Sequence, residues 1–206
     1  MNISDVEMKR FIEGRWLLSF VMVSWIVWQT VASAQPVLSK EKIYQAWPKP
    51  LPHQAFKEVR YDALLEIKSR YEGMFKTAQS EGFTIQYQRP IQGSLSLHNQ
   101  IVTINFPSRK MQISLNQLPE LAQFLRPINA LLYGDPRTVE SQYHVALNIL
   151  SEHAWQLSYQ PKKALPWVAN HLVVTGRWLD ERNQVDIIRL EFASGDWREF
   201  ELMHDD

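Results

Sequence analysis

The chain of 206 residues contains no cysteine, which excludes disulfide bonds, thiolate zinc sites, cysteine nucleophiles and a lipid-modified N-terminal cysteine. It also lacks an excess of charge of either sign, because 22 Lys and Arg residues balance 22 Asp and Glu residues. Nucleic-acid-binding proteins usually show a basic excess, so this balance argues against a nucleic-acid partner. The hydrophobic content of 45% and the aromatic content of 12% are sufficient for the core of one domain.

The N-terminal part of the chain has the pattern of a secretory signal peptide. An almost wholly apolar stretch runs from Trp16 to Val31, and Ala32-Ser33-Ala34 follows it with small residues at the two positions that a signal peptidase reads. We therefore predict a signal peptide over residues 1–34, cut after Ala34, and a single domain over residues 35–206. Initiation at Met8 would give a more basic start. An uncleaved anchor is the alternative, but the stretch is short for a span of about 20 residues.

Apolar and polar residues alternate through most of the remaining chain, which is typical of strands with one buried and one solvated face. Phe83, Ile85 and Tyr87, for example, alternate with threonine and glutamine. Short turn segments rich in Gly, Pro and Asn separate the runs, as in antiparallel connections. The predicted strands cover residues 55–61, 68–77, 83–88, 93–98, 101–106, 110–114, 143–149, 155–159, 171–176, 185–192 and 197–203.

A helical segment interrupts the strands. Leucine and isoleucine recur at helical spacing from Leu118 to Leu132, with Asn116 as the expected cap and Pro127 expected to kink or split the helix. Two short helices are predicted besides it, one after Ser39 and one after Asp135-Pro136. The predicted fold class is mainly β (α+β): a curved antiparallel sheet of about 11 strands, with helices that cover one face.

The sequence shows no pattern of a catalytic or metal site. None of the six histidines has the H-x-x-x-H or H-E-x-x-H spacing of a metal site, and no G-x-S-x-G motif marks a serine nucleophile. The seven glycines form no phosphate-binding loop. Glu191, Glu199, Arg189 and Arg198 lie on the last two predicted strands, where we expect cross-strand ion pairs on a solvated face. No catalytic residue, metal ligand or cofactor is therefore assigned.

Aromatic side chains leave two interpretations open. They form an ordinary core, or a bent sheet under an amphipathic helix encloses an apolar cavity suited to a fatty chain. For any single aromatic residue the core is the simpler interpretation, and the sequence does not decide between the two arrangements.

The order of several short motifs in the second half resembles the LolA family of outer-membrane lipoprotein carriers. A leucine-rich helix ends in Leu-Leu-Tyr-Gly-Asp at residues 131–135, and a Trp-Gln-Leu-Ser-Tyr-Gln-Pro strand follows at residues 155–161. Val-Val-Thr-Gly at residues 173–176 and a hairpin through Ala-Ser-Gly-Asp at residues 193–196 complete the match. The resemblance covers residues 55–202. Within the family, the chain resembles most the divergent branch found beside aryl-polyene and related fatty-acid-type gene clusters.

This resemblance implies a half-open antiparallel β-barrel with a helical lid, located in a Gram-negative periplasm. It implies a carrier without a cofactor and without enzymatic activity, which shields the acyl chain of a lipoprotein or lipid between membrane donor and acceptor proteins. A monomer is expected. The candidate ligand-binding residues lie on the concave strands and the lid helix: Phe56, Phe75, Phe83, Ile85, Leu121, Leu125, Ile128, Trp155 and Leu157.

One departure from the family pattern concerns the lid. In LolA proper an arginine-proline pair on a strand helps to latch the lid, and the matching stretch over residues 73–83 has no arginine. Lys76 is the candidate remnant and Arg60 the candidate substitute. The missing arginine favours a lipid cargo other than that of classical lipoprotein trafficking.

Two further hypotheses stay open at this stage. The protein could be a non-enzymatic assembly factor that docks to an inner-membrane lipid exporter, with a solid core. It could also be an enzyme on the same scaffold, which would need clustered polar side chains inside the cavity, and the sequence shows no such cluster.

Overall fold

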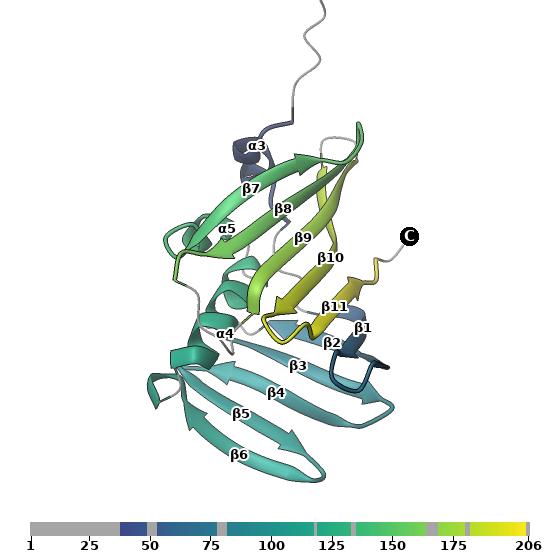
Figure 1. Ribbon diagram of the computed structural model, residues 1–206, viewed down its shortest axis with the longest axis vertical. Helices are drawn as coiled ribbons and strands as arrows, with labels where there is room; N and C mark the ends of the chain where they lie inside the picture. Colours follow the sequence, from purple (N-terminus) through teal and green to yellow (C-terminus); the bar gives the residue numbers. More distant parts are fainter. Residues whose placement is uncertain are drawn as a thin grey trace, which may run out of the picture. The chain divides into compact units, whose positions relative to one another are not determined.

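Eleven strands form one antiparallel sheet in the computed structural model of the chain (Figure 1). The structure describes residues 38–48, 53–77, 82–117, 119–132, 135–163, 169–179 and 182–204. The strands, in chain order, are β1 (His53–Asp62), β2 (Ile67–Thr77), β3 (Gly82–Arg89), β4 (Gly93–His98), β5 (Ile101–Phe106), β6 (Arg109–Ser114), β7 (Tyr143–Ile149), β8 (Ala154–Pro161), β9 (Ala169–Leu179), β10 (Arg182–Phe192) and β11 (Trp197–Leu202).

The signal-peptide prediction falls on residues that the structure does not describe. Residues 1–34 and the expected cut after Ala34 lie outside the described ranges, so both stay predictions. Within those ranges, no helix combines the length and the apolar character needed to cross a membrane.

The strand order is β6-β5-β4-β3-β2-β1-β11-β10-β9-β8-β7. All neighbours in sequence pair as hairpins except across the helical segment, and β1 pairs with β11, for example Phe56 with Leu202. All eleven predicted strands are confirmed, with ends shifted by a few residues. The expected curved, half-open antiparallel sheet is confirmed, and the term β-barrel is corrected in one respect: the sheet does not close, because β6 and β7 stand at the two ends of the order and do not pair with each other.

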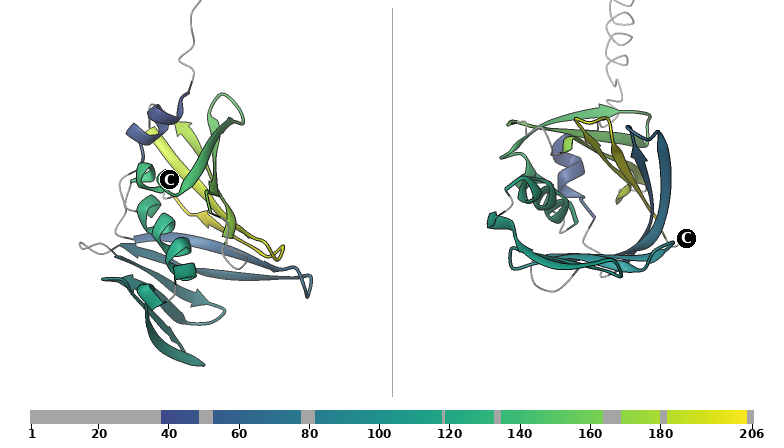
Figure 2. Two further views of the ribbon diagram at one scale, coloured as in Figure 1. Left: turned by 60° about the vertical axis from the view of Figure 1, so that its left-hand side comes forward. Right: turned by 60° about the horizontal axis from the view of Figure 1, so that its bottom comes forward.

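The helical segment connects these two free edges. The 3-10 helix η1 (Leu115–Gln117), α4 (Pro119–Leu132) and α5 (Pro136–Val139) link β6 to β7. Figure 2 shows these helices, together with α3 (Lys40–Gln45), on the concave side of the curved sheet. Because this segment runs from one free edge of the sheet to the other, its helices cover the concave side although β6 and β7 do not pair.

Local signals explain the start of α3 but not that of α4. Ser39 caps α3 as predicted, since its Oγ accepts a hydrogen bond from the backbone N–H of Lys42 at 3.2 Å. Asn116 lies in η1 rather than at the cap of α4. Of the kink or split expected at Pro127, the split is wrong: α4 continues through this residue as one helix of 14 residues. Proline removes one helical hydrogen bond, and burial of the apolar face of α4 against the sheet offsets that loss.

The absence of a Cβ at Gly176 allows the Trp155 side chain to pack closely against the sheet. Gly176 on β9 pairs with Trp155 on β8, and a Cβ built at Gly176 would overlap the Trp155 indole and the backbone oxygen of Gln184. The glycine therefore sets how closely the indole approaches the sheet.

We expect Gly176→Ala to lower the free energy of unfolding by about 1–3 kcal/mol, because the added methyl overpacks this contact. Urea denaturation measures the change. Gly195→Ala offers a contrast at a turn, where the nearest atom to an added Cβ is Ala63 Cβ at 3.1 Å and the backbone φ of +89° itself opposes a side chain. A loss at Gly176 that disappears in a Trp155→Ala background assigns the effect to the indole.

Candidate functional site: the apolar inner face of the sheet

Aromatic rings from four strands meet on the concave face of the sheet. Phe56 lies with its ring centroid 4.7 Å from that of Phe75, 5.4 Å from that of Phe200 and 5.8 Å from that of Tyr87. These residues come from β1, β2, β11 and β3, and all are buried. Strand alternation places them on one face, and the β1–β11 pairing brings the first and the last strand together there.

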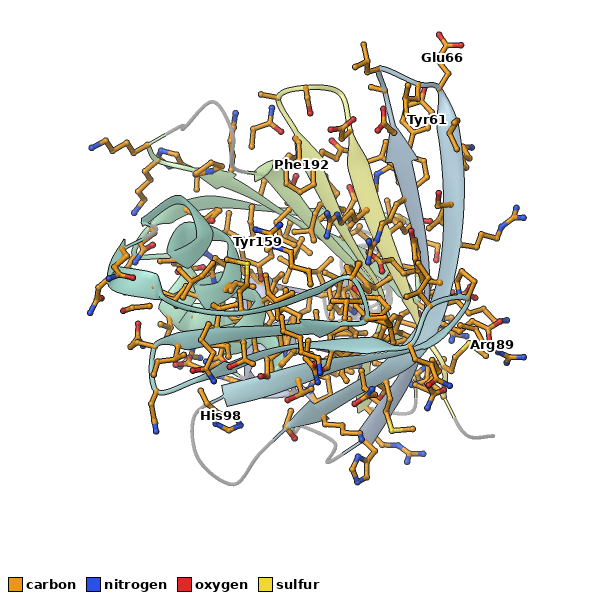
Figure 3. All side chains as sticks on the ribbon, turned by 90° about the horizontal axis from the view of Figure 1, so that it is seen from below. Tyr61, Glu66, Arg89, His98, Tyr159 and Phe192 are labelled. Carbon is orange, nitrogen blue, oxygen red and sulfur yellow. The ribbon has the colours of Figure 1, made fainter. Side chains whose placement is uncertain are left out.

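A second group of buried side chains lies on β8 and beside the helices. Trp155, Leu157 and Tyr159 alternate inward along β8, and the Trp155 ring centroid is 5.9 Å from that of Trp47. Figure 3 places Tyr159 in the interior, between the sheet and the helices. Trp47 Nε1 donates a hydrogen bond of 3.0 Å to the backbone oxygen of Leu131, which ties the segment after α3 to the end of α4.

The structure brings eight of the nine predicted ligand-binding residues into one apolar cluster. Their exposed fractions are 0–6%, so they contact one another and the covering helices rather than solvent. They are Phe56, Phe75, Phe83, Ile85, Leu125, Ile128, Trp155 and Leu157. Leu121 lies in α4, but its side chain is outside the described part of the structure. Binding of a ligand by these residues stays a prediction.

The inner face also holds an ion pair that the sequence interpretation missed. Glu58 is fully buried, and Arg60 donates to it twice, from Nε to Oε1 at 2.8 Å and from Nη2 to Oε2 at 2.9 Å. The Arg60 guanidinium lies over the rings of Tyr71 and Tyr87, 4.0 Å and 5.1 Å from their centroids. The alternation Phe56-Glu58-Arg60 was the available signal, since it places all three on one face.

Burial and charge shift the pKa values of this group. Desolvation is the largest influence and opposes ionisation of Arg60, but the hydrogen bonds that Arg60 donates to Glu58, together with the electrostatic effects of Glu58, Tyr87 and Tyr71, raise the pKa of Arg60 overall. Burial, followed by the nearby Glu58 charge, raises the pKa of Tyr87. Arg60 therefore remains charged and Tyr87 remains neutral at physiological pH.

The two latch candidates lie in different surroundings. Arg60 is engaged with Glu58, Tyr71 and Tyr87, which are all sheet residues. Lys76 follows the inward-facing Phe75 on β2, so alternation places it on the opposite face of the strand. A latch function for either residue remains a prediction.

The predicted ion pairs of the last two strands form in part. Arg189 Nε pairs with Glu191 at 2.8 Å and Arg189 Nη1 pairs across the strands with Glu199 at 3.2 Å, as expected. Arg198 takes a different position from the one expected. It is in register with Arg60 and on the same face of β11 as the buried Phe200, and its guanidinium lies 6.0 Å from the centroid of the Phe192 ring.

A polar chain on the opposite face has the order of a catalytic triad. Ser158 Oγ is 2.5 Å from His171 Nε2, and His171 Nδ1 is 3.2 Å from Glu191 Oε2. Desolvation opposes ionisation of Glu191, but hydrogen bonds from His171 and Arg189 lower its pKa. β8 and β9 each pair with strands on both sides, so their backbone N–H groups are used in the ladder and do not offer an oxyanion hole. We interpret the chain as a surface network.

Comparison with known proteins identifies the family. The family described as "Outer membrane lipoprotein carrier protein LolA-like" matches residues 32–185. A search of curated proteins finds no match.

Solved structures with a similar fold include three proteins at low sequence identity. A LolA superfamily protein from Nitrosomonas europaea is 12% identical over 80% of this chain and 89% of its own, with a TM-score of 0.41. A DUF1329 family protein from Desulfovibrio piger is 10% identical over 80% and 88%, with a TM-score of 0.44. The lipoprotein LppX from Mycobacterium tuberculosis is 7% identical over 80% and 95%, with a TM-score of 0.39.

The match over residues 32–185 spans most of the chain and includes the helical segment and the strands that form most of the inner face. The chain therefore belongs to the LolA-like family of outer membrane lipoprotein carrier proteins.

Proposed function

We propose that this protein is a periplasmic carrier that holds the acyl chain of a lipoprotein or lipid against the inner face of its sheet and moves it towards the outer membrane. The single observation that carries the proposal is the one large apolar cluster on the inner face of an open sheet, covered by helices that join its two free edges. Membership in a family of lipoprotein carriers supports the same function.

The covering helices have to move for such binding. The residues of the inner face are packed against α4, so an acyl chain can reach them only if α4 separates from the sheet. Few polar contacts oppose this separation among the described residues: Trp47 donates to Leu131 O, and Arg126 Nη2 donates to Gln100 Oε1 at 3.3 Å. An acyl chain would replace the apolar contacts that α4 loses, which keeps the net change in buried apolar area small.

The interior also offers a donor for the polar end of a lipid. Trp155 Nε1 is buried, and no hydrogen-bond acceptor for it occurs within the described part of the chain. Indole nitrogen is a donor only, and burial without a partner is unfavourable. The carbonyl oxygen of an acyl ester or amide would satisfy it.

Quenching by a brominated fatty acid tests the proposal without an assumption about the natural lipid. We expect dibrominated stearic acid to quench tryptophan emission saturably, because bromine quenches at contact and Trp47 and Trp155 belong to the inner-face cluster. Trp155→Phe should remove a large part of the quenching. Trp197→Phe, at a residue that faces away from the buried Phe200 on β11, should leave the quenching unchanged.

Two results would contradict the carrier function. One is the absence of saturable quenching together with no lipid in organic extracts of protein purified gently from its host. The other is quenching that depends on Trp197 and not on Trp155, which would place the ligand on the outer face.

The alternative of an assembly factor docking to an inner-membrane lipid exporter has one observation in its favour. The residues predicted to line the cavity are almost fully buried by one another, as in a solid core. Quenching of Trp155 would decide in favour of the carrier, since a docking protein with a solid core gives no access to this indole.

A further inference from the structure

The end of the β1–β2 hairpin carries the two most exposed large apolar side chains of the described residues, with a third beside them. Leu64 is 91% exposed, Leu65 is 63% exposed and Ile67 is 54% exposed. We call these three residues the apolar tip. Single exposed leucines are ordinary on protein surfaces, but three within four positions of one turn are not.

The backbone of the apolar tip is held in place. The carboxylate of Asp196, in the β10–β11 turn, accepts a hydrogen bond of 2.8 Å from the backbone N–H of Ala63. Within the turn, Asp62 Oδ1 accepts a hydrogen bond of 2.9 Å from the backbone N–H of Leu65. The exposed side chains are therefore presented by an ordered turn, so little backbone entropy is lost when they bind.

Aromatic and basic side chains stand directly behind the apolar tip. The rings of Tyr61 and Trp197 stack with centroids 5.7 Å apart, and Lys68 Nζ lies 5.6 Å from the centroid of the Trp197 ring. Figure 3 shows Glu66 at the far end of the hairpin and Tyr61 behind it. Leucine at the outermost position, then tyrosine and tryptophan with lysine, matches the order of environments from the hydrocarbon boundary to the headgroups of a bilayer.

We propose that the apolar tip inserts into the interface of a lipid bilayer. A protruding hairpin end suits a bilayer better than a protein partner, because a stable protein interface needs about 800 Å² on each side. The charges beside the tip show no basic excess, with Asp62, Glu66 and Asp196 against Lys68 and Arg70, so the attraction is apolar and does not depend on anionic lipid. This inference goes beyond the proposed function and does not require a bound acyl chain.

Vesicles of phosphatidylethanolamine and phosphatidylglycerol carrying brominated acyl chains test the inference with the exported form of the chain. We expect these vesicles to quench Trp197, and we expect the protein to sediment with them at low and at high salt. The double variant Leu64→Ser and Leu65→Ser should lower the ratio of bound to free protein about tenfold or more. Quenching of Trp197 reports contact at this tip, whether or not residues 1–34 have been removed.

The opposite end of the strands provides a matched control. Ile149, the last residue of β7, and Leu150, the first residue of the β7–β8 turn, are 48% and 54% exposed. The double variant Ile149→Ser and Leu150→Ser should bind vesicles as the unchanged chain does. If the tip variant unfolds, the single variant Leu64→Ser replaces it, since this side chain has almost no contact to lose.

Three results would overturn the inference: no sedimentation of the unchanged chain, unchanged binding of the tip variant, or equal losses in the tip and control variants. Binding that high salt abolishes would also overturn it, because a protein held by charge does not need the leucines. Quenching by free brominated fatty acid should persist in the tip variant. Failure of vesicle binding is therefore distinguishable from failure of the carrier function.

Discussion

Arg60→Ala is expected to lower the free energy of unfolding by about 3–5 kcal/mol, because it leaves a buried carboxylate without its partner. Glu58 is fully buried, and each of its two carboxylate oxygens accepts a hydrogen bond from the Arg60 guanidinium. The guanidinium also loses its contacts with the rings of Tyr71 and Tyr87. Urea denaturation with linear extrapolation measures the difference.

A neighbouring exposed residue provides the control for Arg60. Lys57 lies on β1 with its side chain exposed, and Lys57→Ala should change the free energy of unfolding by about 0.5 kcal/mol or less. The double variant Glu58→Met and Arg60→Met should recover most of the stability, since apolar residues of similar volume can replace a buried ion pair. A loss for Arg60→Ala no larger than that for Lys57→Ala would refute the buried-pair interpretation.

Trp155→Ala is the second change with a large expected effect, a loss of about 3–5 kcal/mol in the free energy of unfolding. Trp155 is fully buried, contacts Trp47 and lies against Gly176. The cavity left by the indole cannot collapse readily, because β8 and β9, whose residues Trp155 and Gly176 make this contact, are fixed by their ladders to β7 and β10. The thermal unfolding midpoint and the urea midpoint should both fall.

Gln156, the next residue on β8, gives the comparison for Trp155. Its side chain points to the other face, and Gln156→Ala should have little effect on stability. If the inner face binds acyl chains, addition of a fatty acid should raise the unfolding midpoint of Trp155→Ala, because a ligand that occupies the cavity binds only the folded state. Equal stabilities of the two variants would show that the indole is not a core residue.

Much of the inner face could be predicted from the sequence. Alternation identified Phe83 and Ile85 on one strand and Trp155 and Leu157 on another, and all four are buried in the same cluster. The helical spacing around Leu125 and Ile128 placed these residues on the buried side of α4. Each of these predictions says only which face of its own strand or helix a side chain occupies, and the local pattern of apolar and polar residues is sufficient to show this.

Other parts of the site could not be found in this way. Glu58 has the inward parity of Phe56, but a carboxylate at an inward position is expected to be unfavourable until its partner Arg60 is known to be in reach. Arg198 was expected on the solvated face, and only the register of β11 with β1 shows that it faces inward. The Ser158, His171 and Glu191 chain needs three strands side by side, which no spacing in the sequence indicates.

The sequence by itself determined the strands, the helical interlude between β6 and β7, the apolar character of one face and the resemblance to the family. The strands, the helical segment and the apolar face depend on residues within a few positions of one another, where the period of the secondary structure sorts side chains, and the resemblance depends on the order of short motifs along the chain. Only the tertiary structure decided that the sheet stays open, that β1 pairs with β11 and that the apolar tip is anchored by Asp196. The β1–β11 pairing and the Ala63–Asp196 contact join residues more than a hundred positions apart, and all three features depend on packing of the whole domain rather than on any local pattern.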